Sequence, residues 1–290
     1  PSISYSKLQY CTHLLGNIMC SSFLYACCFL NVRATASIAS GACVGSVRCG
    51  KETGPAWFDI AGVRMAPAEL TGRTRSLAWE LSWKDTAAPL WTFPRVAWER
   101  ELLPGAQVVI APTAVFAGSL AVGETTHRVD SWRGSVAHIY GHGNAKRWGW
   151  IHADLGDGDV LEVVTAVSHK PGLRRLAPLA FVRFRIDGKD WPASPLPSLR
   201  MRTTLGVRHW QLEGRIGGRE ALIRVDQPPE RCVSLGYTDP DGAKAVCTNT
   251  EQADIHIELG GRHWSVLGTG HAEVGLRGTA APAIKEGTPA

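Results

Sequence analysis

The stretch RWGWIHADLGDGDVLEVVTAV, residues 147–167, holds two runs of strand-forming residues on either side of a short turn. In the first run large side chains alternate with small ones, so Trp148, Trp150 and His152 share one face if the run is extended. Gly-Asp-Gly at 156–158 suits a tight change of chain direction, and β-branched residues fill the second run. The stretch therefore predicts two β-strands joined by a turn.

The same pattern of strand-forming runs separated by turn residues continues along the chain from Trp57 onward. In FVRFRIDG, for example, Phe181, Arg183 and Arg185 share one face and apolar residues share the other. Turn signals rich in Gly and Asp separate the runs, at 156–158, 187–188, 217–218, 239–242 and 260–261. No stretch after the first fifty residues has a sustained helical period. We therefore predict an all-β fold, an antiparallel sandwich or barrel.

The domain organisation is predicted from a change in composition. The proline-rich segment DWPASPLPSLR, residues 190–200, is the candidate linker between two β-rich halves. We expect an N-terminal β-domain at 53–190 and a C-terminal β-domain at 191–278. Small residues and prolines dominate 279–290, which we expect to be a disordered tail.

Residues 1–52, here called the leader, have a different composition from the rest of the chain. They contain no Asp or Glu before Glu52 and hold six of the eight cysteines. The segment from Leu14 to Val32 is largely apolar, and small residues follow it, as in a secretory signal. An organelle presequence, a short transmembrane anchor and non-native sequence are alternatives. We expect the leader to lie outside the fold, with secretion or organelle targeting if it is genuine and a cytoplasmic protein if it is not.

Composition argues against some classes of function. The net charge of +5 is small for 290 residues, and the arginines are scattered singly, whereas nucleic-acid-binding proteins concentrate basic residues on one face. No glycine-rich phosphate-binding motif occurs in a strand–turn–helix setting, so a nucleotide cofactor is not expected. The eleven tryptophans indicate either the wall of a wide apolar cavity or a bulky β-core.

Another group of chemically active side chains lies just before the opening stretch, in GSVAHIYGHGN. If this segment is also extended, His138, Tyr140 and His142 share one face. A hairpin with the following strand would bring His138 and Tyr140 close to Trp150 and His152 across the strand pair. We predict this hairpin as the centre of the site.

An aromatic face with titratable edges can protonate an alkene or activate a hydroxyl group, provided that a carboxylate such as Asp154 or Asp130 tunes a histidine. A structural alternative makes these histidines the hydrogen-bonded interior of a barrel and the tryptophans its core. A zinc site formed by His138, His142 and His152 is disfavoured, because the first two lie too far apart on a strand to bind one ion.

Nucleophilic chemistry has little support in the sequence. The motif Gly-x-Ser-x-Gly is absent, and Ser135 lies in no nucleophile elbow. Cys232 and Cys247 lie on strands predicted on either side of the turn at 239–242, where they could form a disulfide or remain buried thiols. Neither cysteine stands beside an obvious activating base.

The order of the motifs resembles a known superfamily. A glycine-rich strand end, FAGSLAVGE at 116–124, is followed by Trp-x-Gly-x-x-x-His at 132–138 and by Trp-x-Trp-x-His at 148–152. This pattern resembles the carotenoid hydratase (hydroxyneurosporene synthase), tocopherol cyclase and AttH-like superfamily. The resemblance implies two lipocalin-like antiparallel β-barrels, the first of them incomplete if the leader lies outside the fold.

The resemblance also implies a class of function. Members of the superfamily bind apolar small molecules and carry out proton-initiated hydration or cyclisation of isoprenoid alkenes without a redox cofactor. On this basis we expect a hydrophobic, isoprenoid-like ligand, no cofactor and no metal, with peripheral membrane association as a route to the substrate. A non-catalytic carrier of hydrophobic ligands, with the same residues as structural core, is the alternative.

The candidate site residues fall into two groups. The catalytic candidates, with a histidine and Asp154 as the acid–base pair and the tyrosine as a donor, are His138, His152, Asp154 and Tyr140. The ligand-binding candidates are Trp132, Trp148, Trp150, His142 and Asn144. The superfamily's Asn-Trp after its first histidine is replaced here by Ile139–Tyr140, which removes an amide donor.

Overall fold

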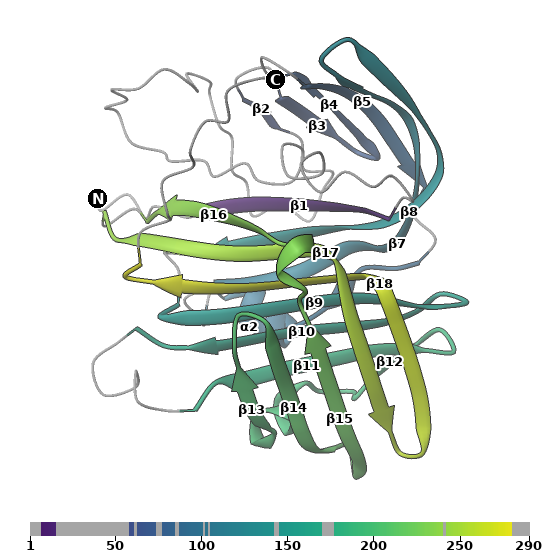
Figure 1. Ribbon diagram of the computed structural model, residues 1–290. Helices are drawn as coiled ribbons and strands as arrows, with labels where there is room; N and C mark the ends of the chain where they lie inside the picture. Colours follow the sequence, from purple (N-terminus) through teal and green to yellow (C-terminus); the bar gives the residue numbers. More distant parts are fainter. Residues whose placement is uncertain are drawn as a thin grey trace.

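Two antiparallel β-sheets make up the part of the chain that the structure describes (Figure 1). This computed structural model describes residues 7–15, 58–60, 63–73, 77–84, 87–100, 102–103, 105–141, 145–169, 177–239 and 242–279. The paired strands in these ranges run antiparallel, as the alternating sequence pattern requires. The prediction of an all-β, antiparallel fold is confirmed, and closure of either sheet into a barrel stays a prediction.

The first sheet has the strand order β1-β8-β7-β5-β4-β3-β2, with β6 beside β7. Its strands are β1 (Lys7–Leu15), β2 (Phe58–Ile60), β3 (Val63–Ala66), β4 (Glu69–Arg73), β5 (Leu77–Lys84), β6 (Leu90–Trp91), β7 (Gly105–Val122) and β8 (Thr125–Gly141). The short helix α2 (Arg95–Glu99) follows β6. The long strands β7 and β8 form a curved hairpin (Figure 1).

The second sheet has the strand order β12-β11-β10-β9-β18-β17-β15-β14-β13, with β16 beside β17. Its strands are β9 (Arg147–Gly156), β10 (Asp159–Val167), β11 (Leu179–Ile186), β12 (Lys189–Trp191), β13 (Arg202–Leu205), β14 (His209–Ile216), β15 (Arg219–Asp226), β16 (Val233–Thr238), β17 (Lys244–Leu259) and β18 (Arg262–Arg277). Two short 3₁₀ helices, η2 (Leu196–Arg200) and η3 (Pro229–Arg231), lie in its connections.

The predicted turns join neighbouring strands of this sheet. The β9–β10 turn at 156–158 has φ angles of 91°, 52° and 84°, a conformation that Gly and Asp tolerate best. Asp187 and Gly188, with φ angles of 52° and 71°, make the two-residue β11–β12 turn, in which positive φ at both residues matches the twist of the strands. The predicted turns at 217–218 and 260–261 join β14 to β15 and β17 to β18 in the same way.

Each sheet packs around its own apolar core. In the second sheet, strands near opposite ends of the order contribute to one core, for example Val182 in β11 and Leu205 in β13, so this sheet curls around it. In the first sheet, Trp79, Phe116 and Val136 belong to a separate core. Full burial of a large apolar side chain stabilises a fold by about 1.5–3 kcal/mol, so each core is a major source of stability.

The chain passes from the first sheet to the second between Gly141 and Arg147. The candidate linker at 190–200 instead connects β12 to β13, the two ends of the second sheet. Within it, the fully buried Ser198 of η2 donates from Oγ to the carbonyl of Ala180 in β11, at 2.9 Å. Sheet membership therefore changes well before residue 190, and the domain division at that residue stays a prediction.

Strand β1 comes from the leader. Its nine residues pair with 133–141 of β8. Over Lys7–Leu15 this pairing differs from the prediction that the whole leader lies outside the fold. Polar and apolar residues alternate over its first four residues, KLQY, as in a strand. The apolar segment from Leu14 to Val32 lies almost wholly outside the described residues, among which no helix is long and apolar enough to span a membrane.

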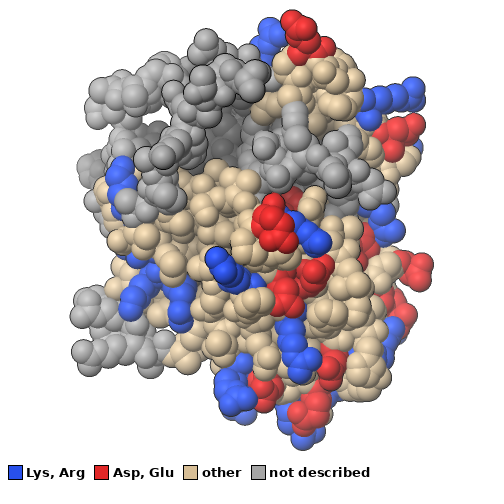
Figure 2. All heavy atoms as spheres, viewed as in Figure 1, with Lys and Arg blue, Asp and Glu red and all other residues tan. Residues whose placement is uncertain are grey.

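Charged side chains of both signs are interspersed among the described residues on the face shown in Figure 2. Some form cross-strand pairs on outer faces of the second sheet, such as Arg202 with Glu213, at 2.8 Å. There the hydrogen bond and charge of Arg202 lower the pKa of Glu213 from its ordinary value. Such exposed pairs lie apart from the contact between the sheets.

Candidate functional site

Glu162 is a fully buried carboxylate at the contact between the two sheets. It lies in β10, and its exposed fraction is 0%. Its Oε1 accepts hydrogen bonds from Gln107 Nε2 of β7 and Trp150 Nε1 of β9, and its Oε2 lies 2.9 Å from His152 Nδ1. A buried carboxylate needs such partners, because removing a charged or polar group from water is costly. This one side chain therefore connects strands of both sheets.

Strand alternation explains why these side chains meet. On β9, Trp150 belongs to an apolar cluster that it shares with the first sheet, whereas Ile151 and Ala153 belong to the core of the second sheet. His152 is on the same face as Trp150, and the antiparallel register sets Glu162 opposite it on β10. The first-sheet members of the apolar cluster are Leu90, Val109, Ala137 and Ile139. The predicted aromatic and acid–base face of β9 thus lies between the sheets.

Strand β18 contributes a second histidine–carboxylate pair to this contact. His271 lies opposite His152 in the register and is only 2% exposed. Its Nδ1 is 3.0 Å from Glu251 Oε1 of β17. The ring of Trp150 meets the imidazole of His271 edge to face, with centroids 4.5 Å apart. The two histidines and Trp150 therefore form one packed group.

Trp148 is fixed against β18 by one hydrogen bond and one close approach. Its Nε1 donates to Glu273 Oε1 at 3.0 Å. Its indole covers Gly275, where an added Cβ atom would lie 2.0 Å from the ring. Only glycine at position 275 leaves room for this arrangement of the indole.

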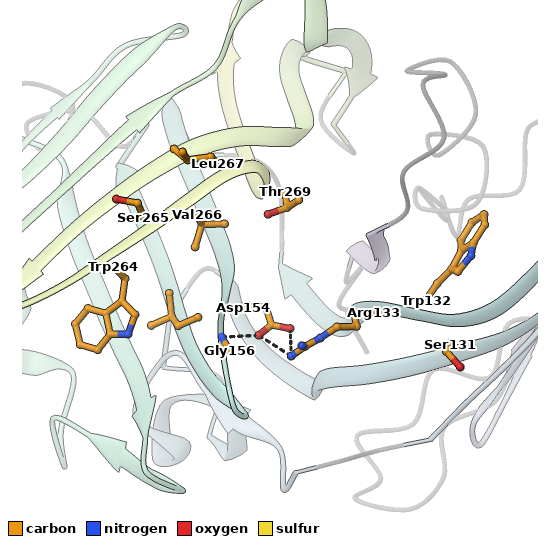
Figure 3. A pocket seen from close by; sticks show the side chains of 11 residues that line it. Ser131, Trp132, Arg133, Asp154, Gly156, Trp264, Ser265, Val266, Leu267 and Thr269 are labelled. Carbon is orange, nitrogen blue, oxygen red and sulfur yellow. Dashed lines mark hydrogen bonds and ion pairs between the residues drawn. The ribbon is translucent and has the colours of Figure 1, made fainter.

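A pocket of about 690 Å³ opens beside the cluster, between β8, β9 and β18 (Figure 3). Its walls combine apolar side chains, among them Trp132, Trp264 and Leu267, with the ion pair of Arg133 and Asp154. Arg133 Nη2 lies 2.7 Å from Asp154 Oδ2 and 2.9 Å from Oδ1. Asp154 lies two residues after the buried His152, on the same face of β9. The pocket therefore lies next to the group formed by Trp150, His152 and His271.

Burial shifts the pKa of one group within the second sheet and of one group beside it. Arg183 of β11 is opposite Glu162 in the register, and burial lowers its pKa although the charge of Asp190 opposes the shift. No disulfide joins Cys232 and Cys247, so the disulfide alternative is wrong for this structure. Burial, with a contribution from the charge of Glu230, raises the pKa of Cys232, which makes it less reactive.

A family model described as tocopherol cyclase-like matches residues 28–276. The chain belongs to the tocopherol cyclase-like family. This match confirms the resemblance drawn from the tryptophan and histidine motifs. It covers every strand from β2 to β17 and nearly all of β18, and so includes the residues described above at the contact between the sheets.

Several solved structures are similar to this chain at low sequence identity. CghA has a TM-score of 0.50 and 16% identity, covering 76% of this chain and 66% of that chain. The structure of CghA with Sch210972 has a TM-score of 0.49 and 16% identity, covering 74% of this chain and 64% of that chain. Kievitone hydratase from Nectria haematococca has a TM-score of 0.46 and 12% identity, covering 71% of this chain and 64% of that chain. The matched part of this chain thus spans slightly less than two thirds of the length of each of these proteins.

For this member of the tocopherol cyclase-like family, the predicted pair of His152 with Asp154 is wrong. His152 bonds Glu162 instead, and Asp154 pairs with Arg133. Glu162 reaches His152 because it lies directly opposite on the neighbouring strand, whereas Asp154 lies further along the strand of His152 itself.

The predicted hairpin of the two histidine-containing segments is also wrong. Strand β8 pairs with β1 and β7, and β9 pairs with β10 and β18, in different sheets. His138 and Tyr140 lie in β8, and His142 and Asn144 lie outside the described residues. The site roles of these four residues stay predictions. Among the residues that the structure describes, no group of three or more His, Cys, Asp or Glu side chains is arranged to hold a metal ion.

Sequence reasoning missed Gln107, Glu162, His271, Glu251 and Glu273. One of them left a signal: Glu162 is the only charged residue in the otherwise apolar or β-branched run VLEVVTAV. A charge within a buried strand demands a partner. Gln107 has no comparable signal, because its contact with Glu162 depends on how two separate sheets pack.

Proposed function

We propose that this protein catalyses proton-initiated hydration or cyclisation of an alkene in a hydrophobic, isoprenoid-like small molecule, at the contact between the two sheets. The observation that carries the proposal is the buried hydrogen bond between His152 and Glu162, next to a pocket with aromatic walls. Membership of a family named for a cyclase supports the same chemistry. The isoprenoid-like substrate class is what the resemblance to the superfamily implies, and the aromatic and apolar side chains of the site suit such a ligand.

In the proposed reaction His152 carries the proton both ways. Its Nδ1 is bonded to Glu162, so a proton is exchanged with the substrate at Nε2. The protonated ring gives this proton to one alkene carbon, which leaves a cation on the other. An oxygen of water or of the substrate's own hydroxyl group then attacks the cation, and its proton returns to Nε2. The step consumes no oxidant or reductant and restores the imidazolium.

The neighbours of His152 give it the support that such a role requires. Gln107 and Trp150 hold the Glu162 carboxylate, and that carboxylate orients the imidazole and compensates its positive charge. The indole of Trp150 supplies an electron-rich face beside the proposed cation, as does Trp148 further along β9. We also propose His138 and Tyr140 as further donors, and Trp132, His142 and Asn144 as ligand contacts.

A carrier function is the second candidate. One observation favours it: both carboxylate oxygens of Glu162 already have protein partners, as a purely structural core would require. A carrier would bind the same hydrophobic molecules in the same pocket and release them unchanged.

The experiment that separates the two uses deuterated water. The full chain is incubated with an extract of isoprenoid lipids, and the lipids are compared by mass spectrometry with those from H152N and E162Q. The proposal predicts products with one carbon-bound deuterium, formed by the parent and lost in H152N. Retention of an unmodified lipid by all three proteins supports the carrier, and conversion that survives in H152N contradicts the role of His152.

A further inference from the structure

Ser135 is a buried polar residue on the face of β8 that is turned toward the second sheet. The residue is 0% exposed. Its Oγ has no hydrogen-bond partner among the side chains and backbone that the structure describes. A buried hydroxyl without a partner is unfavourable, so a native protein seldom keeps one unless a ligand or water completes it.

The register of β8 fixes which way Ser135 points. Pairing with β1 is unbroken from Lys7 opposite Gly141 to Leu15 opposite Arg133, so side chains alternate regularly along this part of β8. Arg133 reaches Asp154 of the second sheet, and Ala137 packs in the cluster that contains Trp150. Ser135 lies between these two positions and therefore faces the second sheet as well.

The same two contacts locate the residue opposite Ser135. Along β9, His152 stands midway between Asp154 and Trp150, as Ser135 stands midway between Arg133 and Ala137 along β8. The strands face one another with their directions opposed, because Arg133 pairs with Asp154 and Ala137 packs in the cluster that contains Trp150. Ser135 and His152 consequently face one another across the contact between the sheets.

We propose that Ser135 Oγ holds the hydroxyl group that adds to the alkene, an assignment that rests on the proposed function. A serine hydroxyl can donate one hydrogen bond and accept others, so it can orient an O–H group. The held oxygen forms a bond to the cationic carbon, its O–H bond breaks, and the proton passes to His152 Nε2. Ser135 forms no covalent bond and is unchanged at the end of the step.

The held hydroxyl has two sources, water or the ligand's own alcohol, and matched probes separate them. Geraniol and 2,6-dimethylocta-2,6-diene share a carbon chain, and only the first has a hydroxyl group. Binding of each to the full chain is measured by tryptophan fluorescence for the parent, S135A and the control T203V. Thr203 is a second buried residue whose Oγ1 has no partner among the described residues. It lies in β13, which pairs with β14 and not with β9, so T203V removes a matched hydroxyl from a strand that is not hydrogen-bonded to that of His152.

If Ser135 holds the ligand's alcohol, the parent and T203V bind geraniol about tenfold more tightly than the hydrocarbon, and S135A loses this preference. If it holds water, the two probes bind equally, and a crystal structure of the hydrocarbon complex shows a water oxygen on Ser135 Oγ that S135A lacks. Either result supports the assignment.

Other outcomes overturn it. A geraniol preference that persists in S135A contradicts the role of Ser135 but not the proposed function. Equal binding of the two probes with no oxygen on Ser135 Oγ has the same meaning. Failure of the parent to bind either probe contradicts the proposed function and this assignment together. Thermal unfolding of S135A separates a structural role: an unchanged or higher Tm is expected, since the hydroxyl has no described partner to lose, and a Tm well below that of T203V contradicts the assignment.

Discussion

Gln107 of β7 donates a hydrogen bond from Nε2 to Oε1 of Glu162 in β10, and so joins the two sheets through a buried carboxylate. Both side chains are almost fully buried, at 3% and 0% exposure. The same Oε1 accepts from Trp150, and Oε2 meets His152. The packing of the sheets and the geometry of the proposed acid–base pair therefore depend on one hydrogen-bonded group.

The change Gln107→Leu tests this dependence. It leaves the apolar bulk in place but removes a donor to a buried carboxylate, so we expect the free energy of unfolding to fall by about 1.5–3 kcal/mol. Urea unfolding followed by tryptophan fluorescence measures it. Gln211→Leu is the matched control, because Gln211 donates to the exposed Glu213, and a much smaller effect is expected there. Equal effects of the two changes would contradict a special role for Gln107.

The change Gly275→Ala tests the close approach of Trp148 to β18. An added Cβ atom would lie 2.0 Å from the indole ring, so the ring or the strand must move and the hydrogen bond to Glu273 is strained. We expect a loss of about 1–3 kcal/mol in the free energy of unfolding. The second change Trp148→Leu should recover part of this loss, since it removes the clashing ring. If the double variant loses as much free energy of unfolding as the two single variants together, the steric explanation is wrong.

Cys232 gives a prediction about pH. Burial raises the pKa of its thiol above the ordinary 9.0, so less thiolate is present in the folded chain than in the unfolded chain near that pH. Alkylation by iodoacetamide at about pH 8 should be slower in the native protein than in urea. The difference should close as the pH rises through the folded-state pKa. Stability from this shift is present below the unfolded value and is lost over the same rise.

The measurement for Cys232 is peptide mass spectrometry after timed alkylation, which separates this thiol from the cysteines of the leader. A native rate equal to or faster than the rate in urea contradicts the direction of the shift. The sulfur also lies 3.2 Å from the carbonyl of Pro228, a contact that favours the protonated thiol in the same direction.

Much of the fold could be predicted because the signals are local. β9, β10 and the turn between them follow from alternation and from Gly-Asp-Gly at 156–158. One exception is β17, which the sequence suggests as two runs, KAVCTNT and ADIHIELGG. The structure forms a single strand with shifts of register between Thr250 and Ile255, so the polar residues between the runs lie at a bulge rather than a turn.

The candidate site was less predictable because its partners come from different sheets. Sequence spacing favours partners that are near in the chain, and Asp154 is the carboxylate nearest to His152 on the same strand face. The actual partner, Glu162, is reached across a turn, and Gln107 is reached only when the two sheets pack. No local period encodes the second kind of contact, so the face of β9 was predictable and its partners were not.

The pocket itself is tested by a pair of matched leucines. Leu267 lines the pocket and is 61% exposed, whereas Leu196 is 52% exposed and is not among the lining residues. Because both are exposed, Leu267→Asp and Leu196→Asp should leave the Tm nearly unchanged. Only the first places a charge beside the ligand, so we expect it to weaken geraniol binding by about fivefold, as the loss of about one kcal/mol of apolar contact requires. Fluorescence titration of both variants decides the matter: equal affinities would mean that hydrophobic ligands bind elsewhere on the protein.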